Sequence, residues 1–306
     1  MKVSNIIFAF SLLGLLFQAK AQTALFNVLA SKGNVKYVAA GSTEEKVIRI
    51  GAKLFSNDKI VVGESAYLGL ASTNGKTIEI KRTGTYEVSK LSSEIASQNA
   101  SVSKKYVDFL AGEINNNGQD MAKNKYKYMK VTGSVDRGGE AFTIYAPKIS
   151  YVLMNAPLYV KWTAKDSVET YKVTLSNIFD EELYSIETTS TSTIIDLPLY
   201  NVGKDADLFI VVTDKKNVNT KTDKINIKSL MAKDAELSNQ AKELKSELAE
   251  QTALNKFVLA SYYADQDLVM NAVEQYEAAI ALEPEVEDYK VVYGEYLVKR
   301  EIIKVK

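Results

Sequence analysis

The chain lacks both cysteine and histidine. Without thiols or imidazoles it has no disulfide, no zinc site built from those ligands, and no Ser-His-Asp or Cys-His relay. Any catalysis would have to use carboxylates, Lys, Tyr or Ser. The absence of cysteine does not by itself indicate a compartment, because disulfides are only one feature of exported proteins.

The sequence also has no excess of either charge, since 38 Lys and Arg residues balance 38 Asp and Glu residues. A protein that binds nucleic acid normally carries a basic face, so we expect no nucleic-acid partner. Hydrophobic residues make up 46% of the 306 positions. That share is sufficient for the cores of two or three domains.

A long apolar run occurs only at the start of the chain. A positively charged beginning precedes about a dozen apolar residues, and the small-x-small tripeptide Ala19-Lys20-Ala21 follows. This pattern predicts a signal peptide over residues 1–21, cleaved before Gln22. The alternative is an uncleaved anchor, which needs about 20 apolar residues. No cysteine follows the site, which excludes lipoprotein anchoring. We therefore predict an exported protein of the periplasm or cell envelope, with no integral membrane span after cleavage.

The next segment alternates apolar and polar residues in short runs that turn residues separate. The pattern predicts strands at residues 60–62, 67–70, 77–80 and 85–88, and Asn74-Gly75 is a strong hairpin signal. The residues that carry the pattern, in chain order, are Gly51, Leu54, Asp58, Ile60, Gly63, Ala66, Leu68, Gly69, Leu70, Ile78, Glu79, Ile80 and Gly84.

This order resembles the β-domain of the FecR family, and the resemblance implies a FecR-like β-domain over residues 22–91. Signalling members of that family also carry a cytoplasmic segment and a membrane span before the β-domain. This chain shows neither, so a role in sigma-factor regulation is not implied.

Residues 92–139 are predicted to form a helical connector and linker. Apolar residues recur at helical spacing from residue 92 to 113, and Asn115-Asn116-Asn117-Gly118 predicts the end of that helix. A basic run with interleaved tyrosines follows at residues 123–130. It has two interpretations: a stripe for nucleic acid or an anionic glycan, or a solvated connector whose tyrosines pack on a neighbouring domain. Because few other basic residues surround the run, we favour the second.

Residues 140–228 return to a period of two and predict about seven strands, which suits a β-sandwich of the immunoglobulin or fibronectin type. The run from Pro157 through Trp162 to Tyr171-Lys172-Val173 and Leu175 resembles the opening of fibronectin-type envelope modules. Trp162 is the only tryptophan of the chain. On such a strand we expect it in the core.

Residues 229–306 predict a long helix and a helical tail. One face of the first helix is marked by Leu230, Leu237, Leu244 and Leu248. The positions that follow have the relative spacing of a tetratricopeptide repeat (TPR): Leu259, Ala260, Tyr263, Ala272, Tyr276, Ala279 and Pro284. The resemblance implies TPR-like α-hairpins. The overall prediction is a multidomain β plus α fold.

Only about one and a half repeats are present, whereas such arrays usually need three or more. The last helix therefore has an apolar face without a following repeat to cover it, formed by Tyr289, Val292, Tyr293 and Tyr296. An apolar face of this kind usually marks a partner surface. The candidate occupants are another copy of this chain, the long helix that begins near residue 229, or a different envelope protein.

No motif predicts an active site or a cofactor. Two Ser-x-x-Lys tetrads, at residues 56–59 and 101–104, lack the companion motifs of penicillin-binding enzymes. Asp180-Glu181-Glu182 are three neighbours at a predicted hairpin turn, whereas glycosidase carboxylates come from separated elements that face a cleft. The sequence therefore predicts a non-enzymatic scaffold that binds proteins or cell-wall glycan, with self-association through the helical tail as one form. The alternatives are a structural or adhesion component and a carboxylate-based glycan hydrolase.

Overall fold

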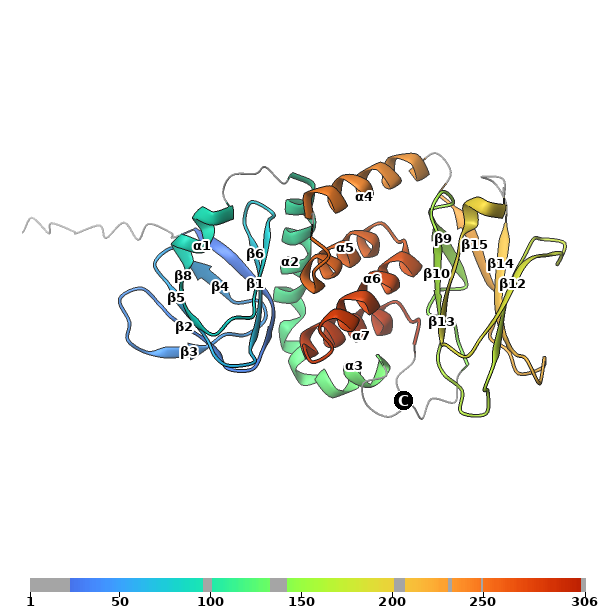
Figure 1. Ribbon diagram of the computed structural model, residues 1–306, viewed down its shortest axis with the longest axis horizontal. Coiled ribbons are helices and arrows are strands. Elements are labelled where there is room, and N and C mark those ends of the chain that lie inside the picture. The colour runs from blue at the N-terminus through green and yellow to red at the C-terminus, as the bar shows by residue number, and fades with distance from the viewer. Residues whose placement is uncertain are drawn as a thin grey trace, which may run out of the picture.

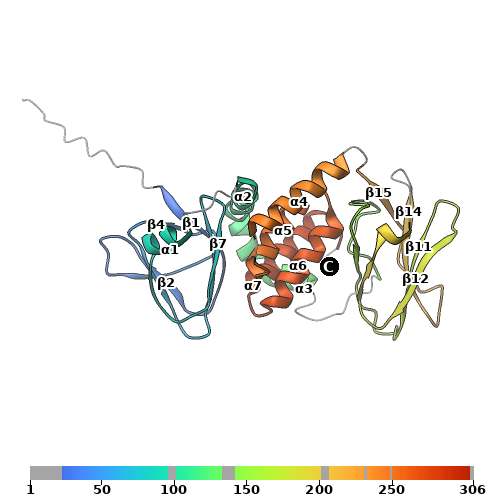
Figure 2. The same ribbon diagram turned by 45° about the horizontal axis from the view of Figure 1, so that its top comes forward.

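The computed structural model describes residues 23–95, 101–132, 142–200, 207–230, 233–248 and 250–303. The predicted signal peptide and the end of the predicted linker, residues 133–139, lie outside these ranges. Along the longest axis of the molecule, a layer of helices separates two β regions (Figure 1). The helices stay between the β regions when the molecule is turned (Figure 2). The C-terminal helices therefore fold back between two regions that precede them in the sequence.

The N-terminal β region consists of two four-stranded sheets with the orders β4-β1-β6-β7 and β3-β2-β5-β8. Its strands are β1 (Ala24–Lys32), β2 (Val35–Val38), β3 (Glu45–Val47), β4 (Lys53–Phe55), β5 (Lys59–Val62), β6 (Tyr67–Ser72), β7 (Thr77–Ile80) and β8 (Gly84–Glu87). The strands predicted near residues 60, 67, 77 and 85 are confirmed by β5 to β8. Asn74-Gly75 forms the expected turn, with Gly75 at a φ of 91°.

Strand β6 is buried at every position, because it lies between two cores. Leu68 and Leu70 point into the core between the two sheets. Tyr67 and Ala71 point the other way, into the core of the helical layer. Successive side chains of a strand alternate between its two faces, so one short strand contributes to both cores. The N-terminal sheets and the helices therefore share a continuous packed boundary.

The second β region also has two facing sheets. The larger has the order β12-β11-β14-β15-β9, and the smaller pairs β10 with β13. The strands are β9 (Ile149–Val152), β10 (Leu158–Lys161), β11 (Tyr171–Ser176), β12 (Glu182–Thr188), β13 (Ser192–Ile195), β14 (Leu208–Asp214) and β15 (Ile225–Ser229). A short 3-10 helix, η1 (Leu197–Tyr200), follows β13. Trp162 is fully buried between the sheets, as expected, with its ring 5.5 Å from that of Tyr171.

Seven α-helices lie within the described residues, and six of them build the central layer. These are α2 (Ser101–Lys123), α3 (Lys125–Val131), α4 (Asp234–Leu248), α5 (Ala253–Asp265), α6 (Val269–Leu282) and α7 (Glu287–Lys299); α1 (Val88–Ile95) belongs to the N-terminal core. Several sheets followed by a run of helices confirm the mixed, multidomain β plus α fold.

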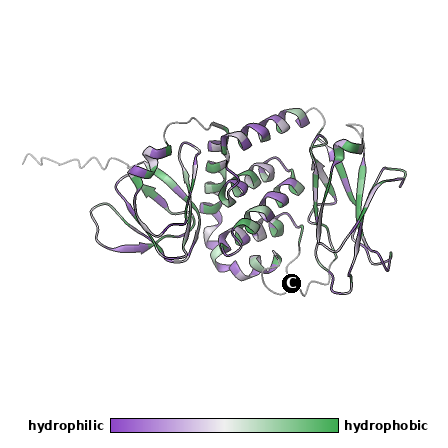
Figure 3. Ribbon diagram, viewed as in Figure 1, coloured by the Kyte–Doolittle hydropathy of each residue, from purple (hydrophilic) through white to green (hydrophobic). Residues whose placement is uncertain are grey.

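The predicted helix end at residues 115–118 is wrong, since α2 continues to Lys123. The reason is packing: Ile114 and Met121, on either side of this polar stretch, are both buried in the helical core. Tertiary burial of an apolar stripe contributes more to a helix than the weak propensity of Asn and Gly opposes. Figure 3 shows the resulting alternation of apolar and polar residues along these helices.

Candidate functional site

The predicted repeat positions form the contact between α5 and α6. Leu259, Ala260, Tyr263, Ala272, Tyr276 and Ala279 are all buried. The alanines allow the two helices to approach closely, and the Tyr276 ring lies 5.9 Å from that of Phe257. Pro284 is exposed in the turn before α7. These residues build the helical hairpin and present no surface to a partner.

The open face predicted on α7 is wrong. Tyr289 and Tyr293 are 0% exposed, Val292 is 7% exposed, and Tyr296 is half-buried. Helix α3, which precedes α7 by more than 150 residues, lies along it and takes the place of a following repeat. A buried side chain cannot anchor a partner, so Tyr289, Val292 and Tyr293 are core residues, and Tyr296 packs against that core.

Gly294 explains how α3 can lie so close to α7. A Cβ atom at this position would be 2.1 Å from the carbonyl oxygen of Tyr128 in α3. Such a distance is impossible for non-bonded atoms, and the obstacle is backbone that cannot rotate away. The absence of a side chain at Gly294 therefore permits the close contact between α3 and α7.

A polar network joins the helices to the N-terminal β region, and we call these contacts the N-terminal junction. The hydroxyl groups of Tyr67 and Tyr289 lie 2.6 Å apart. The Tyr67 hydroxyl also donates to Glu79, whose carboxylate accepts a second hydrogen bond from the backbone N–H of Leu254, each at 2.8 Å. Burial raises the pKa of both tyrosines far above the usual range. They are therefore neutral hydrogen-bonding groups at physiological pH.

Asp288 adds a partly buried carboxylate to the N-terminal junction. Its Oδ2 accepts a hydrogen bond from the backbone N–H of Ser31 at 2.8 Å. Burial raises the pKa of Asp288 to about 6, although that hydrogen bond and the charge of Lys125 lower it, while Glu287 raises it. The carboxylate therefore titrates near neutral pH, and its position on the boundary makes it part of the docking of α7 on β1.

Aromatic rings continue from the N-terminal junction through the helical layer. Phe257 lies 4.8 Å from Tyr289 by ring centroids, and Tyr276 stacks on Tyr293 at 5.1 Å. Together with the contact between Phe257 and Tyr276, these pairs connect Tyr67 of β6 to Tyr293 of α7. Edge-to-face and stacked aromatic pairs are individually directional. This row of rings is a structural feature that fixes how the helices pack.

The contacts between the helices and the second β region, the sandwich junction, are of another kind. Met270 of α6 is buried in the core of the second β region, whereas Tyr145 and Leu153 are buried in the helical core. Its polar contacts include an ion pair between Lys161 and Glu277 at 3.6 Å, a hydrogen bond from Ser238 to Asn155 at 2.9 Å, and a long one from the Tyr145 hydroxyl to the carbonyl of Val131 at 3.4 Å. Exchange of apolar side chains therefore holds this junction.

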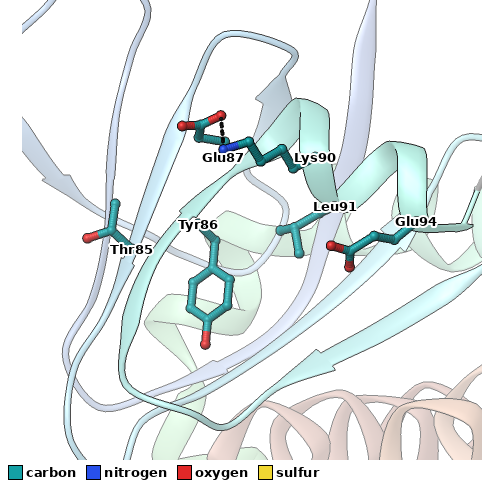
Figure 4. A pocket seen from close by; sticks show the side chains of 6 residues that line it. All are labelled: Thr85, Tyr86, Glu87, Lys90, Leu91 and Glu94. Atoms are coloured by element: carbon teal, nitrogen blue, oxygen red, sulfur yellow. Dashed lines mark ion pairs between the residues drawn. The ribbon is translucent and has the colours of Figure 1, made fainter.

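A hollow lies beside the start of α1. It is lined by Thr85, Tyr86, Glu87, Lys90, Leu91 and Glu94 (Figure 4). Lys90 and Glu87 form an ion pair at 3.0 Å, and the Tyr86 hydroxyl donates to the carbonyl of Arg82 at 2.6 Å. Two of its polar side chains are thus paired with each other and a third is bonded to the backbone, and the hollow is open to solvent. It does not have the enclosed apolar walls that a small-molecule site requires.

Within the described ranges, no group of three or more Asp or Glu residues is placed to hold a metal ion. The three carboxylates from Asp180 to Glu182 are exposed, and consecutive residues do not form a facing pair. In the described part of the chain, no helix combines the length and apolar character that crossing a bilayer requires.

The turn between β11 and β12 is the most unusual surface of the second β region. Ile178 is 61% exposed and Phe179 is 77% exposed, and the two side chains are adjacent. Single exposed apolar residues are common on protein surfaces, but two large ones together inside a turn are not expected. Leu199, which is 72% exposed in η1, lies toward the same end of the strands.

Asn177 holds this turn in one conformation. Its side-chain Oδ1 accepts hydrogen bonds from the backbone N–H groups of Phe179 at 2.9 Å and Glu181 at 3.1 Å. Its Nδ2 donates to the Glu181 carboxylate at 2.7 Å. Asp180 takes the left-handed conformation, with a φ of 63°, and forms an ion pair with Lys224. Ile178 and Phe179 are therefore presented by a rigid turn.

The sequence contained a signal for this turn that we did not use. Our interpretation of the hairpin considered only its carboxylates and placed them at a solvated tip, where the structure has them. The preceding Asn177-Ile178-Phe179 breaks the alternation, because two large apolar residues stand among turn-forming residues. Large apolar residues that interrupt the alternation inside a turn indicate exposed anchors, whereas apolar residues that alternate with polar ones indicate a buried strand face.

No protein-family model matches the chain, and no curated protein matches it.

Proposed function

We propose that this protein is an exported, non-enzymatic scaffold of the periplasm or cell envelope that binds a partner protein through the turn at residues 177–181. The observation that carries the proposal is the pair of exposed anchors, Ile178 and Phe179, on a turn that Asn177 holds rigid. Rigid aromatic anchors dominate the affinity of protein interfaces, because little conformational entropy is lost when they bind.

The charges around the turn define the partner. Asp180, Glu181 and Glu182 flank the anchors, and two lysines, Lys224 and Lys172, pair with the first and the last of them. Glu181 forms no ion pair among the described residues, so the surroundings of the anchors are slightly acidic. The complementary surface is an apolar pocket with a basic rim.

Several features support the scaffold. Both β regions are packed against the same helical layer, so the turn and the N-terminal sheets are held at a fixed separation. We propose that the N-terminal region is FecR-like, since its eight strands occupy the segment that carries that pattern. The proposal of a fibronectin-like sandwich is supported by seven strands divided between two facing sheets. The burial of the repeat positions supports TPR-like packing of α5 and α6.

Site-specific photocrosslinking in the native host tests the binding role. A photoreactive residue at Phe179 should crosslink to one discrete protein, because the anchor enters its pocket. The matched control is Val218, which is 69% exposed in the turn at the opposite end of β14, and it should give no such product. Equal crosslinking at both positions, or none at Phe179, would reject the turn as the docking site. N-terminal sequencing of the same material tests export, with Gln22 expected as the first residue.

A further inference from the structure

The structure divides the basic run at residues 123–130 into two faces. Tyr128 and Met129 are buried against the other helices, as the packing interpretation predicted. Tyr126, in contrast, is 81% exposed, the largest exposed fraction among the large hydrophobic residues described. The lysines on either side of it, Lys123, Lys127 and Lys130, are exposed as well. Only one of the two tyrosines is therefore explained by packing.

The exposed side chains lie on one face, which we call the α3 face: Lys123, Tyr126, Lys127 and Lys130. Helical hydrogen bonds continue from α2 into α3, since Asn124 N–H donates to the carbonyl of Asp120 at 2.9 Å and Tyr128 N–H donates to that of Asn124 at 3.0 Å. Residues four apart are thus neighbours on the surface, which brings Lys123 to Lys127 and Tyr126 to Lys130.

The charge of the α3 face is not neutralised by ion pairs within the described residues. Two carboxylates adjoin it, and each is engaged elsewhere. Asp120 accepts hydrogen bonds from the Tyr128 hydroxyl and the Asn124 amide, and Glu287 pairs with Lys125. Lys127 lies over the ring of Tyr128, 5.9 Å from its centroid, and this contact leaves its charge intact. Three like charges so close together favour an anionic ligand.

We propose that the α3 face binds an acidic polysaccharide. The exposed ring of Tyr126 offers a flat apolar surface for the C–H face of a sugar ring, and the neighbouring lysines pair with the carboxylates of the sugar chain. The face extends along seven residue steps, or about 10 Å of helix, which suits a short stretch of a linear chain. This goes beyond the protein-binding role of the turn, since it uses a different surface and a different class of ligand.

Two other anionic partners fit the observations less well. A nucleic acid is held by many phosphate contacts along a basic surface, whereas this chain has no excess of basic residues. An anionic bilayer is usually bound by a helix with a broad apolar face, whereas Tyr126 is the single large apolar side chain exposed on the described part of α3. A sugar chain needs only one aromatic platform with charges beside it.

Calorimetric titration of the purified full chain at low ionic strength tests the proposal. The probe is a galacturonic acid hexasaccharide, with maltohexaose as the neutral comparison. We expect the uronate to bind and the neutral sugar not to bind. Uronate binding should weaken when the salt concentration is raised from about 20 to about 200 mM, because salt screens the attraction between the lysines and the sugar carboxylates. Absence of uronate binding at millimolar concentration overturns the proposal.

Variants then locate the site. Tyr126→Ala and the double variant Lys127→Gln/Lys130→Gln should each weaken uronate binding by about tenfold or more. Tyr126→Phe keeps the platform and should bind like the original chain. The control is Lys53→Gln/Lys242→Gln, two exposed lysines of β4 and α4. All five positions are exposed, so unchanged thermal unfolding is expected throughout. Equal affinity in Tyr126→Ala and the original chain rejects the α3 face.

Two further titrations exclude the other partners. A twelve-nucleotide oligothymidylate tests for nucleic acid, and phosphatidylglycerol vesicles test for a membrane. If either binds more tightly than the uronate and loses binding in Tyr126→Ala, the polysaccharide proposal is wrong. An Ile178→Ser/Phe179→Ser variant should bind uronate normally, which separates failure of this proposal from failure of the docking turn.

Discussion

The N-terminal junction and the sandwich junction join the same helical layer to two β regions by different means. At the N-terminal junction, buried hydroxyl, carboxylate and backbone groups form a directional network around Tyr67, Tyr289 and Glu79. At the sandwich junction, Met270 enters one core and Tyr145 and Leu153 enter the other. Directional bonds specify orientation, because a buried donor or acceptor that loses its partner is costly. Apolar side chains that enter a neighbouring core hold the two regions together but fix their relative orientation less strictly, because such contacts are non-directional.

The difference suggests that the second β region is the more independent part. Each β region has a core cluster of its own, and among the described residues the central helices add only Met270, to the core of the second region. The helical core includes four buried residues of the N-terminal strands, Leu29, Ala30, Tyr67 and Ala71, but only two of the second β region, Tyr145 and Leu153. Elements that share a core unfold together, whereas elements joined at few points unfold as separate units. Four predictions test this comparison.

The largest effect is expected from Trp162→Ala. Removing this fully buried side chain should cost ~3–5 kcal/mol through lost burial and a cavity. Because the sandwich core is separate, calorimetry should show its transition moving to lower temperature while the transition of the helices and N-terminal sheets stays in place. Val218→Ser, an exposed change in the same region, should move neither. A single transition that shifts as a whole would show that the two junctions couple equally.

Gly294→Ala should have the next largest effect. The added Cβ meets the backbone of Tyr128, so α3 must move away from α7 at a cost of ~1–3 kcal/mol. The matched control is Gly112→Ala on α2, where a Cβ meets nothing within 4 Å and alanine favours the helix by up to ~1 kcal/mol. Urea unfolding measures both. Stabilisation by the two substitutions alike would contradict the close approach of α3 to α7.

A pair of double-mutant cycles compares the junctions directly. Tyr67→Phe with Tyr289→Phe should give a coupling energy of ~1 kcal/mol, because the two hydroxyl groups are buried and bonded to each other. Lys161→Ala with Glu277→Ala should give ~0.5 kcal/mol or less, because that pair is 3.6 Å apart and partly solvated. Equal couplings in the two cycles would remove the distinction between a directional junction and an apolar one.

The smallest effect concerns pH and Asp288. The folded-state pKa of about 6 lies above the usual value of an aspartate side chain, so the folded chain binds this proton more tightly than the unfolded chain. The contribution of Asp288 to the free energy of unfolding therefore increases as the pH falls through 6, by ~1 kcal/mol between pH 7 and pH 5. Asp288→Asn should flatten this part of the stability–pH profile. If the original chain and Asp288→Asn show the same slope, the pH dependence of stability belongs to other carboxyl groups, namely Glu274 and Glu295, whose pKa values burial also raises.

Much of the local structure was predictable from the sequence. Alternation and Asn74-Gly75 predicted the strands β5 to β8, and the position of Trp162 on a strand predicted its burial. Strand β9 has no such signal, because it pairs in parallel with the distant strand β15 and no hairpin turn joins the two. The docking turn is distinguished by Ile178 and Phe179 and not by its acidic residues, which mark any solvated tip.

The apolar faces of α5, α6 and α7 were determined by the sequence alone, since helical periodicity requires that such faces be buried. What buries them was decided by the tertiary structure. Helix α3 packs on α7 at Gly294, and β6 supplies Tyr67 as the partner of Tyr289, although both elements are far from α7 in the chain. A periodic pattern shows which face of a helix must be buried, but it does not specify which element of the chain covers that face. That choice depends on long-range complementarity, here the absence of a side chain at Gly294 and a hydroxyl placed opposite Tyr289.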